Sequence, residues 1–257
     1  MRKLTSFIVI ICLLTAMLGF GVVYTQDEKT VEGLEPYKVL EDGSIVVEAY
    51  RVTENGLIKL SKEDYSSLNT ERTSKEKQLS FEKKGNMLPN KLVVDSIFTP
   101  YGFEPYYGDV YEERGVIDPF YKTDLTRRIS EIWKNSTTSN MTHTFGCSTS
   151  QNYQVNIDLS WSQKNAITAK LGGSWNNSVS FKSETQYQIP AGKYGWVNFT
   201  PAMKNSYGYM QYVKYQTLNS YYVVSEEWTD IYIPRKLSTG NADGILECIT
   251  SNTQPEY

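Results

Sequence analysis

The feature that most constrains the fold is an alternation of apolar and polar side chains between residues 153 and 189. In its first part, apolar side chains take the odd positions: Tyr153, Val155, Ile157, Leu159 and Trp161. The same phase returns further along, at Ile167, Ala169, Leu171, Trp175, Val179, Phe181, Tyr187 and Ile189. Because successive side chains of a strand point to opposite faces, this pattern predicts a long β ribbon with one apolar and one polar face.

The position of the turn in this ribbon stays open. Two antiparallel strands that share an apolar face pair odd residues with odd residues, so their loop holds an odd number of residues. Gln163-Lys164-Asn165 and Gly172-Gly173-Ser174 both meet this condition. The first choice gives strands 153–161 and 167–175, which match the about 9–11 residues of a tilted transmembrane strand. Such a ribbon either covers a soluble sandwich core or faces lipid with its apolar side.

Composition and turn signals favour a mainly β fold. The chain holds 20 tyrosines, and aromatic residues prefer strands. Asn55-Gly56 between apolar runs predicts a hairpin over residues 45–60. We expect an elongated antiparallel sheet or sandwich. A capping-box pattern that begins at Ser61 predicts a short helix near 61–68, and apolar spacing predicts another near 124–133.

The N-terminus has the pattern of a secretory signal peptide. Arg2 and Lys3 precede an apolar run from Phe7 to Val23, and polar residues follow. The run is close to the about 17 residues that span a bilayer, so an uncleaved anchor is the alternative for residues 1–26. A charged stretch at 69–86, a solvated helix or a linker, marks the next predicted boundary. We therefore divide the remainder into 27–86, a hairpin region with a charged linker, and 87–257, the main β domain.

Two cysteines remain outside the predicted leader, Cys147 and Cys248. In an exported chain an even number of cysteines predicts a disulfide. The bridge would close a loop of about 100 residues, which the chain-entropy account values at about 4.7 kcal/mol.

Catalytic chemistry finds little support in the sequence. His143 and Cys147 lie on one face of a predicted strand, but no motif makes them a nucleophile pair. One histidine and two cysteines do not make a zinc site, and no nucleotide-binding or hydrolase motif occurs. We expect no catalytic residue, no metal and no cofactor. A net charge of −3 gives no reason to expect a nucleic-acid partner.

Aromatic residues gather in a turn-rich region and form a candidate binding patch. Its members are Tyr101, Phe103, Tyr106, Tyr107 and Tyr111. Residues 207–222 are also rich in tyrosine. Such side chains stack on sugar rings or contact protein partners when they are exposed. Alternatively, they fill strand faces and leave only their hydroxyls in water.

The residues after the ribbon carry a resemblance to a known family. Ile189-Pro190-Ala191-Gly192-Lys193 is followed by Tyr194-Gly195-Trp196-Val197-Asn198-Phe199, Pro201 and Tyr207-Gly208-Tyr209. Pro190 and Gly192 suit a type I turn between strands. An amphipathic Ser/Thr-rich ribbon, such a turn and a long strand resemble the pore-forming module of the aerolysin-like toxins, including the epsilon-toxin and mosquitocidal-toxin branch. The resemblance covers about residues 137–233.

This resemblance implies secretion as a soluble monomer and oligomers whose ribbons close into a barrel. By position, Tyr153–Trp175 would be the inserting hairpin, although Trp161 and Trp175 are bulky for that role. No receptor-binding region can be named, and residues 27–125 match nothing in the family. A shared fold does not prove a shared activity.

We therefore expect a non-enzymatic β protein, exported to the extracellular space or the cell envelope. Its ribbon would interact with a lipid membrane and with other copies of the chain. The alternative is a binding module that recognises a cell-surface carbohydrate or protein through tyrosine-rich loops, and a secreted enzyme ranks last.

Overall fold

The computed structural model describes residues 35–85, 92–94, 104–172, 178–217 and 220–256. The predicted leader at 1–26 lies outside these ranges. Residues from Leu34 to Tyr257 form one compact unit. Among the described helices, none has the length and apolar character needed to cross a bilayer.

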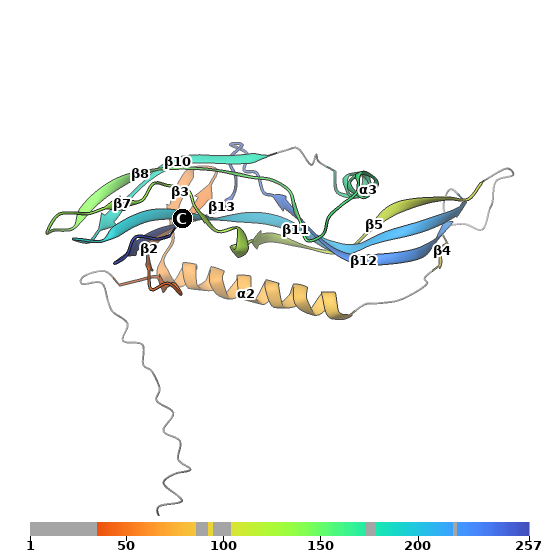
Figure 1. Ribbon diagram of the computed structural model, residues 1–257, viewed down its shortest axis with the longest axis horizontal. Helices are drawn as coiled ribbons and strands as arrows, with labels where there is room; N and C mark the ends of the chain where they lie inside the picture. The colour runs from red at the N-terminus through yellow and green to blue at the C-terminus, as the bar shows by residue number, and fades with distance from the viewer. Residues whose placement is uncertain (1–34, 86–91, 95–103, 173–177, 218–219, 257) are drawn as a thin grey trace, which may run out of the picture. The chain divides into compact units, whose positions relative to one another are not determined.

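The described part of the protein is mainly β, as the composition predicts, and it includes the α-helices α2 and α3 (Figure 1). In chain order the elements are β1 (Lys38–Val39), β2 (Ile45–Thr53), β3 (Gly56–Lys59), α2 (Lys62–Gly85), β4 (Leu92–Val94), β5 (Tyr106–Tyr121), the 3-10 helix η1 (Thr123–Leu125), β6 (Arg127–Arg128), β7 (Trp133–Lys134), β8 (Met141–Gln151), β9 (Gln154–Val155), α3 (Trp161–Leu171), β10 (Val179–Ile189), β11 (Tyr194–Thr217), β12 (Ser220–Pro234) and β13 (Gly244–Ser251).

Strand β11 is the central strand of the large antiparallel sheet, and it changes neighbours along its 24 residues. Its first part, Tyr194–Pro201, pairs with β13, and β6 and β7 pair with the same part. Its second part lies between β5 and β12, from Ala202 to Thr217. One strand therefore belongs to both halves of the sheet.

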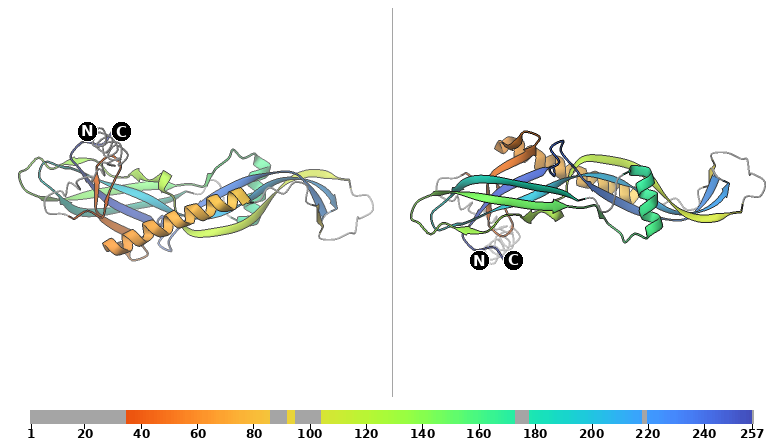
Figure 2. Two further views of the ribbon diagram at one scale, coloured as in Figure 1. Left: turned by 90° about the horizontal axis from the view of Figure 1, so that it is seen from below. Right: turned by 90° about the horizontal axis from the view of Figure 1, so that it is seen from above.

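A second sheet consists of β8 and β10 alone, paired from Met141–Ile189 to Gln151–Val179. In both strands the buried side chains stand at odd positions and the even positions are exposed. Phe181 stacks on Phe199 of β11 with ring centroids 5.4 Å apart. The Tyr187 hydroxyl donates to the carbonyls of Trp196 and Ile249, at 2.9 and 2.6 Å. The alternation predicted for 179–189 is thus confirmed, and its apolar face covers the main sheet (Figure 2).

The predicted hairpin over 45–60 is confirmed as β2 and β3. Thr53 faces Gly56, so Glu54 and Asn55 form the loop, and Gly56 has a φ of 103°. Positive φ is the conformation that glycine adopts without strain. Strand β2 also pairs with β13, so residues on both sides of the boundary expected at 86 share one sheet and one compact unit.

Helix α2 begins where predicted but continues to Gly85 rather than ending near residue 68. Ser61 caps it, because its Oγ accepts the Asp64 N–H at 3.0 Å. Beyond residue 68 the sequence is rich in Lys, Glu and Gln, which favour helix even without an apolar face. Tyr65 and Leu79 are buried, and most other described positions of the helix face solvent.

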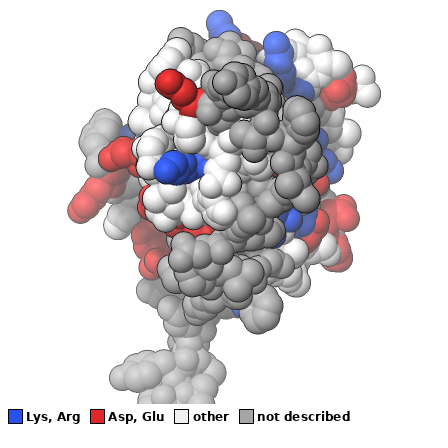
Figure 3. Space-filling model, turned by 90° about the vertical axis from the view of Figure 1, so that its right-hand side faces the viewer, with Lys and Arg blue, Asp and Glu red and all other residues white. Residues whose placement is uncertain are grey.

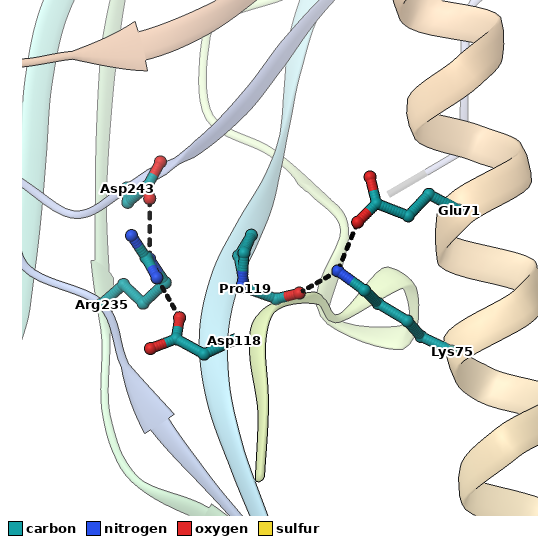
Figure 4. A network of polar contacts seen from close by, with 6 residues as sticks. All are labelled: Glu71, Lys75, Asp118, Pro119, Arg235 and Asp243. Carbon is teal, nitrogen blue, oxygen red and sulfur yellow. Dashed lines mark hydrogen bonds and ion pairs between the residues drawn. The ribbon is translucent and has the colours of Figure 1, made fainter.

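Two polar networks fix α2 and the neighbouring strands (Figure 4). Lys75 Nζ pairs with Glu71 Oε1 at 2.6 Å and donates to the Pro119 carbonyl at 3.0 Å. Arg235 contacts Asp118 through Nη1 and Asp243 Oδ2 through Nε, the latter at 2.9 Å. The first network ties α2 to β5, and the second ties β5 to the segments that flank β12 and β13.

The prediction of a helix near 124–133 is wrong. Only Thr123–Leu125 forms a single 3-10 turn, and the short strands β6 and β7 follow. Arg127 and Arg128 pair with Phe199 and Asn198 of β11, and the Ile129 N–H donates to the Val197 carbonyl at 2.9 Å. The free edge of β11 offers these residues backbone partners, which outweighs a helical spacing of apolar side chains.

The turn after β10 is present, but its type differs from the expectation. Lys193 N–H donates to the Pro190 carbonyl at 3.2 Å, and Gly192 has a φ of 72°. Gly192 is the third residue of a turn that begins at Pro190, and its positive φ excludes type I, which needs a negative φ there.

Candidate functional site

The predicted ribbon contains a helix, and this is the main correction to the sequence analysis. Of the candidate membrane-facing residues, Val155 lies in the short strand β9, and Trp161, Ile167, Ala169 and Leu171 lie in α3. Tyr153, Ile157 and Leu159 lie outside regular elements. Trp175 lies outside the described residues. The expectation of a continuous strand is therefore wrong for residues 161–171.

Local sequence explains why α3 forms. Ser160 Oγ accepts the Gln163 N–H at 3.3 Å, and the Gln163 side chain accepts the Ser160 N–H at 2.8 Å. This reciprocal capping box stabilises the first turn of a helix. Ile167 and Leu171 are four residues apart, so odd-position alternation also contains a helical spacing. Ala166 and Ala169 are strong helix formers.

Helix α3 packs on the half of the main sheet built from β5, β11 and β12. Ile167 is 1% exposed and contacts a buried cluster of Tyr111, Met210 and Ile231. Four partly buried residues complete the cluster: Val155, Leu159, Leu171 and Ile233. Several candidate membrane-facing side chains are thus brought together here, against the sheet.

Polar contacts hold the segment before α3. The Asn156 side chain accepts the Asp230 N–H at 2.8 Å and donates to the Trp228 carbonyl at 3.3 Å. In β9, Val155 faces Ile231 of β12. Ser162 at the start of α3 donates to the Asp109 carboxylate of β5. Trp161 is 78% exposed, so it contributes little to this packing.

In the sequence, residues 152–178 connect β8 to β10, and we call them the inserted segment. Strand β8 leads into the inserted segment, and β10 follows it. The pairing of β8 with β10 is symmetric about Asn165, since Gln151 faces Val179 and Met141 faces Ile189. The inserted segment therefore interrupts a hairpin that is already paired over eleven residue positions.

A polar cleft of about 250 Å³ lies at the beginning of the inserted segment. Its lining includes Asp124 and Arg127 on one side and Ser150, Gln151 and Gln154 on the other. Arg127 Nε donates to Thr149 Oγ1 at 2.9 Å, and its Nη2 donates to the Ser150 carbonyl. Arg127 thus ties the end of β8 to the edge of the main sheet.

The predicted aromatic patch is divided by the structure. Tyr106 and Tyr107 are exposed by 49% and 53%. Tyr111 is buried, and its hydroxyl shares a hydrogen bond with Ser206, so it is a core residue rather than a binding residue. Tyr101 and Phe103 lie outside the described residues. Tyr212 and Tyr222, from the second tyrosine-rich stretch, are also exposed. Strand parity alone does not place them beside Tyr107, because the register of β5 on β11 depends on two bulges.

The predicted disulfide is absent. Cys147 and Cys248 are both free thiols and both buried. Both lie in the layer between the β8–β10 pair and the main sheet. The Cys147 thiol donates to the Phe145 carbonyl, with Sγ and O 3.7 Å apart. Burial raises the pKa of Cys147 to about 11. A neutral thiol is the opposite of the thiolate that a nucleophile or a metal ligand requires.

His143 is engaged by aromatic neighbours rather than by Cys147. Its ring stacks on Trp133 with centroids 4.5 Å apart, and Phe145 meets it edge-on at 4.6 Å. Nε2 lies 3.3 Å from Glu131 Oε1. Among the residues that the structure describes, no three His, Cys, Asp or Glu side chains gather as a metal site would need.

Comparison with known proteins adds one distant likeness. No protein-family model matches the chain, and no curated protein matches it. A similar solved structure is that of parasporin-2, a Bacillus thuringiensis toxin that recognizes cancer cells. It is 11% identical, with 60% of this chain and 74% of that chain covered and a TM-score of 0.21. At this TM-score the function has to be argued from the residues themselves.

Proposed function

We propose that the protein acts on membranes by extending its β8–β10 pair. In this proposal the inserted segment leaves the main sheet and α3 unwinds. The segment then continues the ladder as an amphipathic hairpin. One observation carries the proposal: a paired hairpin encloses a segment whose alternation has the same phase as the flanking strands.

The existing register fixes how the extension would pair. Symmetry about Asn165 sets Leu159 opposite Leu171 and Trp161 opposite Ala169. Lys164-Asn165-Ala166 then forms the tip. In this proposal the turn is a three-residue loop that lies one position after the first sequence-based choice. Strand 153–163 matches the about 9–11 residues that cross a bilayer.

The two faces of the extended hairpin would suit lipid and water. Its odd face carries the apolar residues and is continuous with Phe145, Phe181 and Tyr187 of the existing pair. Its even face continues the exposed polar side of β8 and β10, which includes Thr144, Ser148 and Gln186. If the inserted segment were a strand in water, its apolar odd face would be exposed. The helix buries Ile167 and therefore has the lower free energy in water.

A hairpin in lipid also needs partners for its edges. Unpaired backbone N–H and C=O groups are costly in hydrocarbon, so only closed barrels of strands are stable there. The proposal therefore requires several copies of the chain to pair β8 of one with β10 of the next. The partner is a second copy of this protein, and the product is a pore.

A reversible disulfide between β9 and β12 tests this function. Val155 and Ile231 face each other, and the Asn156 N–H donates to the Asp230 carbonyl at 3.3 Å. They are thus a non-hydrogen-bonded pair, whose Cα atoms lie about 4.5 Å apart and can be bridged. We expect Val155→Cys/Ile231→Cys to release dye from liposomes when reduced and to release none when oxidised.

The single variants Val155→Cys and Ile231→Cys are the matched controls, and oxidation should leave both active. Equal dye release by the oxidised and reduced double variant would show that the inserted segment stays in place during membrane damage. If the unsubstituted protein releases no dye, the proposal fails as a whole, and a binding module becomes the better account.

A further inference from the structure

Three exposed tyrosines form one surface at the far end of β5, β11 and β12. Tyr107, Tyr212 and Tyr222 are exposed by 53%, 42% and 40%, and we call them the tyrosine face. The rings of Tyr107 and Tyr212 stack with centroids 5.4 Å apart. Lys214 Nζ lies 5.8 Å from the Tyr107 ring centre. Seen from this end, the described surface shows a basic group among uncharged groups, with acidic groups above and below it and at the rim (Figure 3).

The tyrosine face lies on the same side of the sheet as α3. Along β5, Tyr107, Asp109 and Tyr111 alternate onto one face. Tyr111 contacts Ile167 of α3, and Asp109 accepts from Ser162. Tyr212 is the strand partner of Asp109. The first turn of α3, with the exposed Trp161, therefore adjoins the tyrosine face.

The chemistry of this surface fits the headgroup region of a bilayer. Tyr and Trp carry an apolar ring with a polar tip, and they concentrate where lipid meets water. A lysine among them adds attraction to anionic lipids. The side chains stand on three adjacent strands of a sheet. The cleft near Arg127 and the cleft between Tyr37 and Thr73 are lined by other residues. Side chains that are spread over adjacent strands in this way can contact a bilayer surface together.

We infer that the tyrosine face docks the folded protein onto bilayers that contain anionic lipid, before the inserted segment moves. The inference rests on the proposed function and names its first step. Docking through this face brings Trp161 and α3 next to the lipid, so the segment that must enter the membrane unwinds beside it.

The opposite side of the same sheet provides a matched control. Tyr106 is 49% exposed but neighbours Tyr107 in the strand, so it points to the other face. It stacks on Tyr215 with centroids 4.6 Å apart. Replacing Tyr106 removes as much exposed aromatic surface as replacing Tyr107, without touching the tyrosine face.

The experiment measures docking while conversion is blocked. The full chain with Val155→Cys/Ile231→Cys is oxidised and floated with vesicles of phosphatidylcholine and about one-third phosphatidylserine. We expect it to bind. Adding Tyr107→Ser, Tyr212→Ser and Tyr222→Ser should weaken binding about tenfold or more, and Tyr106→Ser should leave it within about twofold. Circular dichroism and urea midpoints check that each variant is folded.

The possible results separate the docking inference from the proposed function. Equal weakening by Tyr106→Ser and by the triple variant would overturn the inference, as would binding that needs a glycan-bearing lipid or no binding at all. Docking by the oxidised protein without dye release by the reduced protein would instead overturn the proposed function and leave the docking face standing. Dye release by the reduced protein, together with unchanged vesicle binding by the triple variant, would overturn the docking inference and leave the proposed function standing.

Discussion

Residues 179–189 and residues 153–171 follow the same alternation, yet one region is a strand and the other contains a helix. In β10 each large odd side chain finds cover on the main sheet, as Phe181 does on Phe199 and Tyr187 through its two carbonyl acceptors. In α3 the main anchor is Ile167, and Trp161 stays in solvent.

The difference teaches that alternation fixes a strand only where a surface is present to cover its apolar face. Residues at i and i+4 share a face in a helix, and they also share a face in a strand. Where cover for only one or two side chains is available, capping and helix propensity decide the outcome. The sequence of the inserted segment is therefore compatible with both helix and strand, and its environment selects between the two.

The largest expected effect separates the two regions by stability. Phe181→Ala should lower the free energy of unfolding by about 3–5 kcal/mol, because it leaves a cavity between two packed layers. Trp161→Ala removes a larger side chain but should change the free energy of unfolding by less than about 0.5 kcal/mol. Urea denaturation followed by fluorescence measures both. Equal losses would mean that Trp161 is packed in solution and that the two regions do not differ in cover.

Alkaline pH should weaken the layer between the β8–β10 pair and the main sheet. Burial raises the pKa of Cys147 from 9.0 to about 11 and raises those of Cys248 and Tyr187 well above their ordinary values. A thiol with a raised folded-state pKa stabilises the fold fully below its unfolded-state pKa, and that contribution is lost as pH rises toward the folded value. We expect urea midpoints to be level up to about pH 9 and to fall toward about pH 11.

Cys147→Ser is the control for this prediction, because a serine hydroxyl does not ionise in that range. Its urea midpoint should fall less steeply between the same two pH values. A midpoint that stays level in the unsubstituted protein would show that the thiols are accessible to water in the folded state.

The smallest expected effect concerns the start of α3. Ser160→Ala removes the cap of the first turn and should destabilise the helix by about 1 kcal/mol. Hydrogen exchange measured by mass spectrometry should then quicken over residues 161–171 and stay unchanged over β10. Ser148→Ala, on the exposed face of β8, is the matched control and should alter neither. A uniform change across the chain would mean that α3 opens only with global unfolding.

Much of the fold follows from local sequence. The hairpin at 45–60 depends on the positive-φ glycine that follows its loop, and the start of α2 depends on a serine cap. The strand at 179–189 depends on an alternation that finds cover. Each depends on residues close together in the chain, so each is visible without the structure.

Helix α3 was missed although its signals are local, because the alternation and the capping box compete in the same residues. Other errors come from a partner that is distant in sequence. Residues 127–128 and 133–134 form short strands because the edge of β11 accepts them. Tyr111 is buried because α3 lies over it. The tyrosine face depends on bulges that set the register of β5 on β11. No local pattern carries this information. Cys147 and Cys248 were expected to pair on the basis of number and compartment, which say nothing of side-chain placement.

The continuity of β11 has a consequence for how the molecule comes apart. Since this one strand supplies hydrogen bonds to partners at both ends of the sheet, no seam exists along which one half can melt alone. Unfolding is then expected as a single cooperative transition. Folding is expected to be slow, because strands that precede β11 and strands that follow it must both find β11 before either gains stability from it.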